Sequence, residues 1–534
     1  MNNGSPLPHV QRLLRSCISS SEQSLVSEQL RDAEKELRCH EIEINKLKAA
    51  LLSLENKRSR LTHKIHQFRS LLAPIHRLPT EMLANIFKHA IHGKSYYEQI
   101  SRTQASTVFT LSVVCGRWRE IILSTPSLWS YISFQLNDWL HIEEYDEDDM
   151  PLQVATDMEV EISRLARIVQ LFLKRSQSTQ LDLDLNFVLI SPSETRSFIA
   201  VRRMCDVLFP TAQRWRSLNI AGQAPTFDSH ALYALFSNLS SLKHLGLPGR
   251  FWSGRPLSGC PSLTSISLRE DVNPAMLLVP WQQVKRLDFT GYSGSIEKVA
   301  DILRSCSGVE DLTLELAPFA VPTSLPIVVP FVRSFTVKGF NASRAGPNSI
   351  SIFQCLSLPQ LTVLSIIGDE THLGIEAFAD FLRRSSCNIT HLTIQTSDEH
   401  RANKDVIIPF LRLLPTLKVL RLEESRGYGS STRQNECVSR TILRQLSSHQ
   451  RCDSDSPFLP RLSELILSIY GRSLDTDALL EAVTSRWLPA ESDVGVDCLR
   501  SLTLEMRDSQ VPSLEPLHYL RDAGLRVEIF GLPY

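Results

Sequence analysis

Apolar residues recur every three or four positions between Val26 and Leu72, which is the spacing of a heptad repeat. A helix with this pattern carries one apolar seam along its length and needs a partner helix to cover it. At 1.5 Å per residue, the helix would be roughly 70 Å long. We therefore expect a coiled coil over residues 23–73, with a seam that includes Leu30, Leu37, Ile44, Leu47, Leu51, Leu54, Leu61 and Ile65.

Two seam positions, His40 and Arg58, are polar. A single polar residue in a seam can set the register of two helices, or it can simply be tolerated. The uninterrupted seam favours a parallel homodimer or a docking rod for another protein. A single helix that folds back against its own chain remains the alternative.

Two shorter amphipathic segments follow the heptads. Pro79 suits the first turn of a helix, where its missing N–H removes a donor that would be unpaired anyway. The apolar residues of the two segments recur at helical spacing, first at Met82, Leu83, Ile86, Phe87 and Ala90, and then at Val114, Cys115, Trp118, Ile121 and Ile122. Two helices this apolar can pack together and still leave apolar surface for a partner, although a small self-contained core is the alternative.

The rest of the chain repeats one six-residue pattern, apolar-x-x-apolar-x-apolar, from Trp215–Ile220 to Leu499–Leu504. An initial half-repeat lies at Leu181–Leu185. Most intervals are close to the roughly 20–29 residues of leucine-rich repeats. Since one strand and one helix cannot bury their apolar sides alone, we expect stacked units in a curved solenoid. An ordinary doubly wound α/β domain is the alternative.

These patterns predict an α+β multidomain protein. The expected parts are a disordered tail at 1–22, the coiled coil at 23–73, a small helical domain at 74–134 with an insert at 92–107, an acidic linker at 138–157, and a leucine-rich-repeat-like solenoid at 158–534 with a disordered loop at 423–457.

Composition narrows the function. The chain has 534 residues, too many for one compact core, and a formal net charge of −1, which argues against a nucleic-acid binder. No apolar run approaches the roughly 18 residues of a membrane span. The eleven cysteines form no Cys-x-x-Cys pair, which is typical of free thiols in a reducing compartment, and we expect a cytoplasmic or nuclear protein. Arg12 and Arg15 faintly resemble a mitochondrial transit peptide, but a disordered tail is favoured.

No catalytic constellation is evident. Gly93-Lys94-Ser95 resembles the end of a phosphate-binding loop, but Lys88 stands where the first glycine of that loop is needed. Zinc-type cysteine pairs and His-Glu-x-x-His are absent from the sequence. We therefore expect no metal, no cofactor and no intrinsic enzyme activity.

The order of motifs between Leu78 and Trp129 resembles the F-box, the docking module of cullin–RING ubiquitin ligase adaptors. The resemblance lies in Leu-Pro-x-Glu-x-Leu-x-x-Ile-Phe from Leu78, Val-Cys-x-x-Trp-Arg from Val114 and Pro-x-Leu-Trp from Pro126. Residues 92–107 depart from it, because they are longer and more polar than the usual connector. The resemblance implies binding to a Skp-type linker through Leu78, Pro79, Leu83, Ile86, Phe87, Val114, Cys115 and Trp118.

The combination resembles fungal F-box proteins with an N-terminal coil and irregular repeats. It implies a substrate-recognition adaptor of a Skp–cullin–F-box ubiquitin ligase, with the solenoid holding a target protein that the sequence does not name. Mixed charges at positions such as Arg286, Asp288 and Arg421 favour a protein-binding concave face. The alternative is a scaffold whose F-box-like helices only brace the repeats.

Overall fold

The computed structural model describes residues 20–92, 105–135, 152–186, 203–221, 239–248, 260–269, 279–290, 296–316, 326–339, 352–368, 375–396, 404–424, 438, 440–447, 457–469, 474–487, 495–507 and 515–531. The chain divides into two compact units, Met1–Leu83 and Ala84–Tyr534. The tail expected at 1–22 lies almost entirely outside the described residues, as does most of the insert at 92–107.

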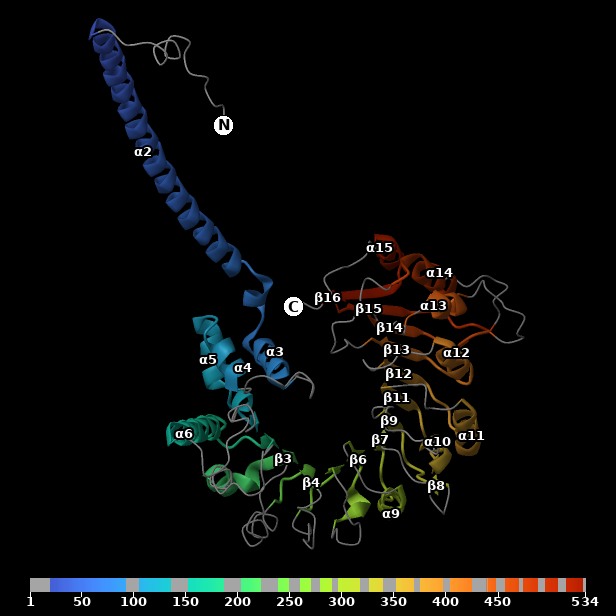
Figure 1. Ribbon diagram of the computed structural model, residues 1–534. Coiled ribbons are helices and arrows are strands. Elements are labelled where there is room, and N and C mark those ends of the chain that lie inside the picture. The colour runs from blue at the N-terminus through green and yellow to red at the C-terminus, as the bar shows by residue number, and fades with distance from the viewer. Residues whose placement is uncertain are drawn as a thin grey trace. The chain divides into compact units, whose positions relative to one another are not determined.

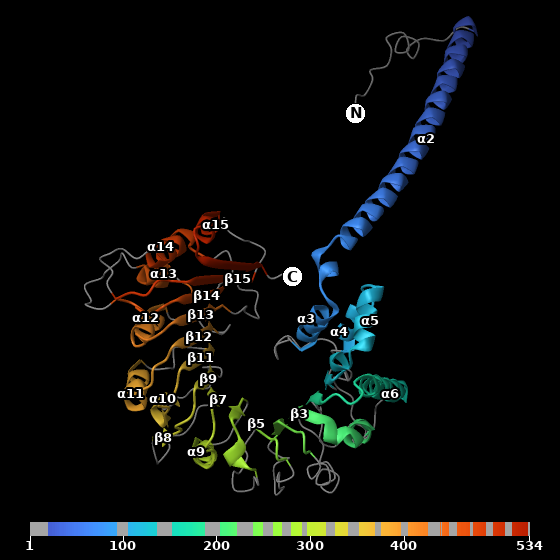
Figure 2. The ribbon, with the colours of Figure 1, turned by 180° about the vertical axis from the view of Figure 1, so that it is seen from behind.

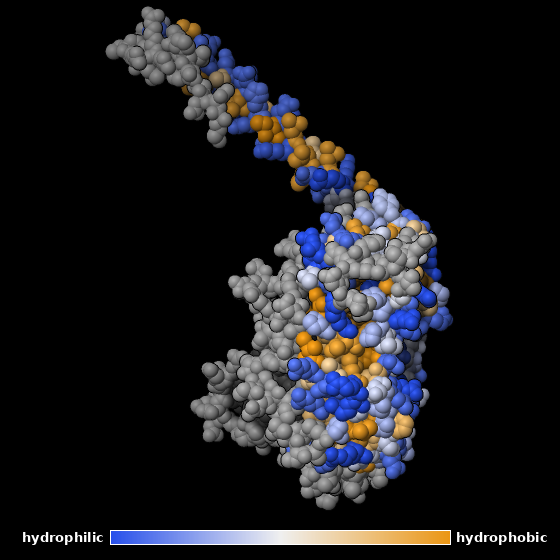
Figure 3. All heavy atoms as spheres, turned by 90° about the vertical axis from the view of Figure 1, so that its right-hand side faces the viewer, coloured by the Kyte–Doolittle hydropathy of each residue, from blue (hydrophilic) through white to orange (hydrophobic). Residues whose placement is uncertain are grey.

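The first unit is dominated by α2 (Ser20–Leu71), a helix of 52 residues. It contains no glycine or proline, and it ends shortly before Pro74 opens a 3-10 turn, η1 (Pro74–Arg77). None of its residues is buried. Figure 3 shows apolar side chains exposed along the helix among hydrophilic ones.

The small helices come next. They are α3 (Thr80–His92), which spans the boundary of the two units, then α4 (Ala105–Ser112), α5 (Gly116–Ser124) and the 3-10 turn η2 (Pro126–Trp129). Pro126 opens η2 as an N-terminal proline should, since its missing N–H leaves no donor unpaired.

The described part of the second unit contains a 14-stranded parallel sheet whose strands follow one another in chain order (Figure 1). They are β1 (Tyr131–Gln135), β2 (Leu181–Asn186), β3 (Trp215–Ala221), β4 (His244–Pro248), β5 (Ser265–Arg269), β6 (Arg286–Phe289), β7 (Asp311–Leu316), β9 (Ser334–Gly339), β11 (Val363–Gly368), β12 (His391–Thr396), β13 (Val419–Glu423), β14 (Glu464–Ile469), β15 (Ser501–Met506) and β16 (Arg526–Gly531). A separate pair joins β8 (Ile327–Val328) to β10 (Leu356–Ser357).

The register aligns the same repeat position across neighbouring strands. Leu364 of β11 pairs with Phe335 of β9 and Leu392 of β12, and Leu392 pairs with Leu420 of β13. All four side chains are buried. Successive strand residues point to opposite faces, so one face is an apolar ladder and the other carries the polar residues between.

Helices cover the apolar face, on the outside of the curved sheet (Figures 1 and 2). They are α6 (Leu152–Arg175), α9 (Ile296–Ser305), α10 (Ile352–Cys355), α11 (Ile375–Ser385), α12 (Lys404–Arg412), α13 (Arg440–Leu446), α14 (Thr476–Trp487) and α15 (Glu515–Asp522). The expected architecture is confirmed, namely a long N-terminal helix, small helices and a repeat solenoid in which each strand is buried by its neighbours.

An aromatic cluster joins three successive outer helices. Phe353 of α10 lies 5.0 Å from Phe378 and 5.2 Å from Phe381 of α11, measured between ring centroids. Phe378 in turn stacks on Phe410 of α12 at 4.1 Å. Aromatic pairs at these separations contribute beyond their buried area.

Three arginines link successive repeats by donating hydrogen bonds to backbone carbonyl oxygens. Arg384 of α11 donates to the carbonyl oxygens of Phe353 and Leu356. Arg486 of α14 donates to those of Leu446, Phe458 and Leu459. Arg214 donates to the Thr179 carbonyl and the Ser176 hydroxyl. Each guanidinium therefore satisfies at least one acceptor in or just after the last turn of a preceding helix.

Some elements fall across the expected boundaries. β1 begins within the expected helical domain at 74–134, yet it pairs with β2 as the first strand of the sheet. The α6 helix begins at Leu152, inside the expected linker at 138–157. The expected loop at 423–457 contains α13, because Ile442, Leu443 and Leu446 give that short segment an apolar side to bury.

Candidate functional site

The segment from Leu78 to Trp118 contains the residues predicted to bind a Skp-type linker. Leu83 and Phe87 are buried, at 0% and 1% exposure. Leu78, Cys115 and Trp118 are half-buried, whereas Pro79 is exposed. The last two, Ile86 and Val114, expose 43% and 56% of their surface.

Helical spacing explains why neighbouring residues of α3 differ so much in exposure. Leu83 and Phe87 are four residues apart and share one face, which faces the interior. Met82 and Ile86 are also four apart but are rotated by about 100° onto the exposed side. The buried face of α3 forms core, and its other face presents apolar side chains to solvent.

Phe87 and Trp118 hold α3 against α5. Their ring centroids are 4.7 Å apart, with planes inclined by 56°. Because Trp118 is only half-buried, one side of its ring packs on Phe87 while another part remains accessible. This contact fixes the segment of α3 that carries Ile86 relative to the start of α5.

The turn before α5 exposes two adjacent valines. The amides of Val113 and Val114 donate to the carbonyl oxygens of Thr110 and Leu111, at 3.3 and 3.4 Å. These bonds fix the turn, and Val113 is 75% exposed while Val114 is 56% exposed. Sequence reasoning did not include Val113 in the docking surface, because it lies one residue outside the apolar spacing of the second helix.

Trp129 belongs to the packing between the small helices and the first repeat. Its indole Nε1 donates to the carbonyl oxygen of Ile122 at 2.7 Å. Its ring meets Phe172 of α6 edge-on, with centroids 5.0 Å apart. At 2% exposure, Trp129 has no surface left for a partner and instead anchors η2 to α6.

The predicted coiled-coil seam is exposed throughout. Exposures run from 49% to 65% for Leu30, Leu37, Ile44, Leu47, Leu51, Leu54, Leu61 and Ile65. Such a continuous apolar stripe is a second candidate surface for another chain.

The polar face of the sheet carries a network of charges near its C-terminal end. Arg421 of β13 contacts the carboxylates of Glu423 and Glu505, the latter at 2.9 Å. Arg507 reaches Glu423 from the other side, at 3.2 Å. The sequence pointed to Arg421 but not to the acids beside it, because Glu505 lies 84 residues away and is brought close only by the stacking of repeats.

At the other end of the same face, polar groups are tightly packed. Asn219 Nδ2 donates to Asp184 Oδ1 at 2.8 Å, and burial raises the pKa of the Asp184 carboxyl against the lowering effect of that bond. Gly246 lies beside Asn219, and a Cβ there would stand 2.5 Å from the Asn219 Oδ1 atom. The glycine therefore leaves room for the asparagine side chain.

His244 is part of this polar end. Its Nδ1 lies 2.8 Å from the Ser265 hydroxyl oxygen. Burial lowers the pKa of His244, and the positive charges of Arg286 and Arg269 lower it further, while Asp288 and Asp182 act in the opposite direction. The imidazole is therefore neutral near pH 7 and serves hydrogen bonding.

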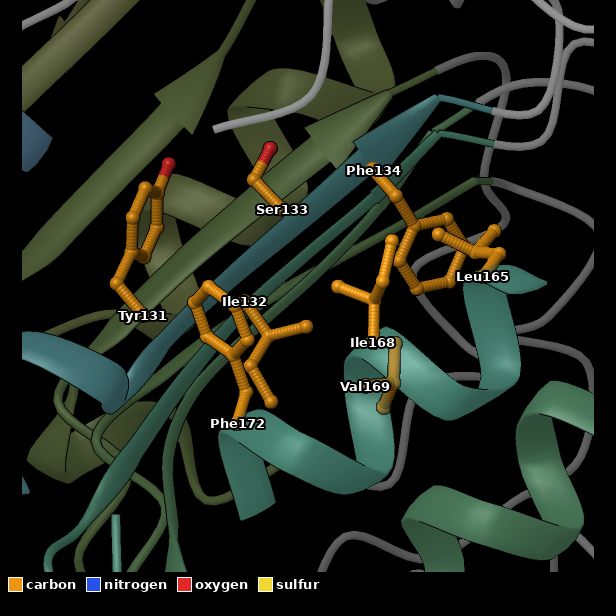
Figure 4. A pocket seen from close by; sticks show the side chains of 8 residues that line it. All are labelled: Tyr131, Ile132, Ser133, Phe134, Leu165, Ile168, Val169 and Phe172. Carbon is orange, nitrogen blue, oxygen red and sulfur yellow. The ribbon is translucent and has the colours of Figure 1, made fainter. Parts of the chain in front are cut away.

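A small apolar cavity lies between β1 and α6 (Figure 4). Its volume is about 20 Å³, and its lining residues are Tyr131, Ile132, Ser133, Phe134, Leu165, Ile168, Val169 and Phe172. Sites for small molecules typically measure about 300–1,000 Å³, so this gap is a packing defect that holds no ligand of that size.

Within the described ranges, no group of three or more His, Cys, Asp or Glu residues is arranged to hold a metal ion. Over the same ranges, none of the helices combines the length and the apolar character that a bilayer crossing requires.

Comparison with known proteins points to the small helices. No curated protein matches the chain. Among solved structures, the crystal structure of the TLR13–ssRNA13 complex is similar at 15% identity and a TM-score of 0.28. That match covers 67% of this chain but only 39% of the other, and a likeness at this level does not extend to function. The F-box-like family model matches residues 75–135, and this segment of the chain is an F-box-like domain.

Proposed function

We propose that the chain is a substrate-recognition adaptor of a Skp–cullin–F-box ubiquitin ligase. The observation that carries this proposal is the exposure of Ile86 and Val114, two apolar side chains of the F-box-like domain. The fold leaves them in solvent although the same helices bury Leu83 and Phe87 almost completely. Apolar residues that a small domain leaves uncovered are typical of a protein-binding surface.

The predicted docking residues divide into two roles. Ile86 and Val114, together with Val113, can contact the Skp-type linker directly, and the open part of Trp118 can do the same. Phe87 supports them by fixing the ring of Trp118. In the first unit, the exposed ring of Pro79 is the corresponding contact candidate, with Leu78 half-buried beside it in sequence.

The solenoid supplies the target-binding surface in this proposal. Its polar face offers both charge signs, as in the network of Arg421, Glu423 and Glu505, which suits a protein ligand better than a polyanion. The adaptor then acts by proximity, since a bound target lysine meets the ubiquitin thioester at raised effective concentration. No catalytic group of this chain takes part, and the adaptor would work in the cytoplasm or nucleus.

The test uses the full chain with Ile86→Ser and Val114→Ser combined. We expect its affinity for a recombinant Skp-type linker subunit, measured by isothermal titration calorimetry, to fall by at least about tenfold, because central apolar contacts dominate such interfaces. Thermal unfolding followed by circular dichroism should be unchanged, since substitutions at exposed positions usually alter stability by less than about 0.5 kcal/mol.

Tyr519→Ser is the matched control. Tyr519 is 70% exposed on α15, far along the chain from the F-box-like domain, so this variant should bind the linker like the wild type. Wild-type protein that fails to bind the linker, or a double variant that binds it undiminished, would contradict the adaptor function. The scaffold alternative would then be favoured.

A further inference from the structure

The long helix α2 leaves its whole heptad seam in solvent. No residue of the helix is buried, and its apolar seam side chains reach 65% exposure at Leu54. A helix with such a stripe is stable when another helix covers it. Neither the ligase function nor the F-box-like domain explains this surface, and the partner that covers it does not depend on either of them.

The charges that flank the seam are divided along the helix. In the heptad abcdefg, Leu30 occupies position a and Leu47 occupies position d. The positions that flank the seam are therefore e, directly after each d residue, and g, directly before each a residue. In the first half of the helix the charged flanking residues are all acidic, namely Glu34, Glu36, Glu41 and Glu43. In the second half they are mostly basic, namely Lys48, Lys57, Lys64 and Arg69, with Glu55 as the exception.

This division disfavours two parallel copies. In a parallel pair each g residue meets the following e residue of the partner. Glu36 would then face the partner's Glu41 and Lys64 the partner's Arg69, and only Glu43, opposite Lys48, would meet an opposite charge. In an antiparallel pair, g residues meet g residues and e residues meet e residues. Glu36 then lies against the partner's Lys64 and Glu43 against the partner's Lys57, which gives four opposite-charge contacts in the dimer against two Glu41–Glu55 contacts and one Lys48–Lys48 contact of like charge.

The polar seam positions point to the same orientation. In parallel copies Arg58 would face the partner's Arg58 inside the seam, which places two guanidinium charges together. Antiparallel copies that overlap over the full seam are centred on Ala49. In that register Arg58 faces the partner's His40, whose ring carries a nitrogen that can accept a hydrogen bond from the guanidinium.

The remaining layers of this antiparallel register are apolar and complementary in size. The small Ala33 lies opposite the partner's Ile65. The other layers pair Leu30 with Phe68, Leu37 with Leu61, Ile44 with Leu54 and Leu47 with Leu51 of the partner. The two polar residues of the seam thus fall in the same layer, and no apolar seam residue is left opposite a charge.

We propose that α2 binds a second copy of this chain as an antiparallel two-helix coiled coil, centred on Ala49. The orientation differs from the parallel one that the seam alone suggested. At 1.5 Å per residue, the C-terminal ends of the two copies of α2 lie about 66 Å apart. The dimer therefore separates the segments that follow α2 instead of placing them side by side.

Charge reversal in the full chain tests the orientation by sedimentation equilibrium. One variant combines Glu36→Lys with Glu43→Lys, and a second combines Lys57→Glu with Lys64→Glu. In the antiparallel dimer each variant alone has only like charges at these positions, so its dimer dissociation constant should rise by at least about tenfold. An equimolar mixture restores four opposite-charge pairs and should form a heterodimer at least as stable as the wild-type dimer.

A parallel dimer would respond differently. In the first variant the Glu36–Glu41 contact would become attractive and the Glu43–Lys48 contact repulsive, so the dimer dissociation constant would stay unchanged. The second variant would form a more stable dimer, because the new glutamate side chain of Lys64→Glu would meet Arg69 of the partner. Either of these results overturns the proposal, and so does a wild-type chain that remains monomeric at tens of micromolar, a range in which a coiled coil of this length should assemble.

Single cysteines give a geometric check on the same full-length protein. Ala50→Cys lies next to the two-fold axis and should form an inter-chain disulfide under mild oxidation. Ala33→Cys should not, because its two copies would be about 48 Å apart. The wild type, with Cys39 exposed on α2, controls for native thiols. A disulfide in Ala33→Cys but not in Ala50→Cys would establish the parallel arrangement and contradict the proposal.

Discussion

At the scale of single residues, some polar side chains on the polar face of the sheet are more deeply buried than its composition suggests. Asp184 and His244 lie among strands β2 to β5, and burial disfavours the charged form of both side chains. Hydrogen bonds from Asn219 to Asp184 and between His244 and Ser265 compensate for part of the lost hydration. These residues therefore fix the strands in register and are not simply a solvated surface.

His244 should make the stability of the solenoid depend on pH. Burial holds the pKa of His244 in the folded chain below the ordinary histidine value of about 6.5, so on acidification through about pH 6.5 the unfolded chain takes up a proton before the folded chain does. Stability is fully present above that pH and falls as the pH drops, by at most about 1.4 kcal/mol per pH unit for one group.

The comparison is between wild type and His244→Gln, by urea denaturation at pH 7.5 and pH 5.5. We expect the wild type to lose more unfolding free energy than the variant over this interval, because glutamine does not titrate. Identical pH dependence in the two proteins would show that the folded state does not exclude the proton from His244.

At the scale of elements, arginine side chains join one repeat to the next. The last carbonyls of a helix lack partners within the helix, and buried acceptors without a donor are costly. Arg384 and Arg486, each from the following repeat, donate hydrogen bonds to carbonyl oxygens at the end of the preceding helix. Arg486 is only 3% exposed. The planar guanidinium presents five N–H donors in a rigid fork, so it can reach two or three carbonyls at once.

Arg384→Met should lower the local unfolding free energy by about 2–3 kcal/mol, because it removes charge-assisted bonds and leaves the carbonyls of Phe353 and Leu356 without these donors. Arg383→Met is the matched control on the same helix. Arg383 is 77% exposed and pairs with Asp380 at i,i+3, so its loss should cost less than about 0.5 kcal/mol. Native-state hydrogen exchange of α10 and β10 measures both, and equal effects would contradict the bridging role.

At the scale of the whole molecule, the second unit behaves as a one-dimensional array. Each strand pairs with its sequence neighbours in the sheet, so interactions of the array run mainly between adjacent units. The aromatic cluster of Phe353, Phe378 and Phe410 adds a rigid centre to this array. A local defect should therefore spread to adjacent repeats and fade with distance.

Phe378→Ala tests this behaviour. It removes a fully buried ring, at a cost of about 3–5 kcal/mol in a core that cannot collapse around the cavity. Hydrogen exchange should accelerate in β9 to β13 and stay unchanged in β2 to β4. Phe331→Ala, at a ring that is 47% exposed, is the control and should change neither region. Uniform acceleration across the sheet would show that the array unfolds as one unit.

The sequence by itself determined the recurring elements. The six-residue pattern located β3 to β7, β9 and β11 to β15, and the half-repeat at Leu181–Leu185 located β2, because each strand must bury its apolar positions against the next repeat. It did not reveal β1 and β16. In Tyr131–Phe134 and Val527–Ile529, apolar and polar residues alternate over only a few positions, which is too short to predict a strand. These segments form strands because the edge of the neighbouring sheet offers them backbone hydrogen bonds. The heptads likewise predicted α2, since helical spacing is local.

Tertiary structure decided which of the predicted contact residues are accessible. Leu83, Ile86 and Phe87 look alike in a sequence of apolar residues, yet packing against neighbouring helices buries two of them and leaves Ile86 open. The arginine bridges and the network around Glu505 also depend on residues far apart in sequence. Periodicity is a property of the local chain, whereas burial and pairing depend on what lies opposite, which only the assembled repeats supply.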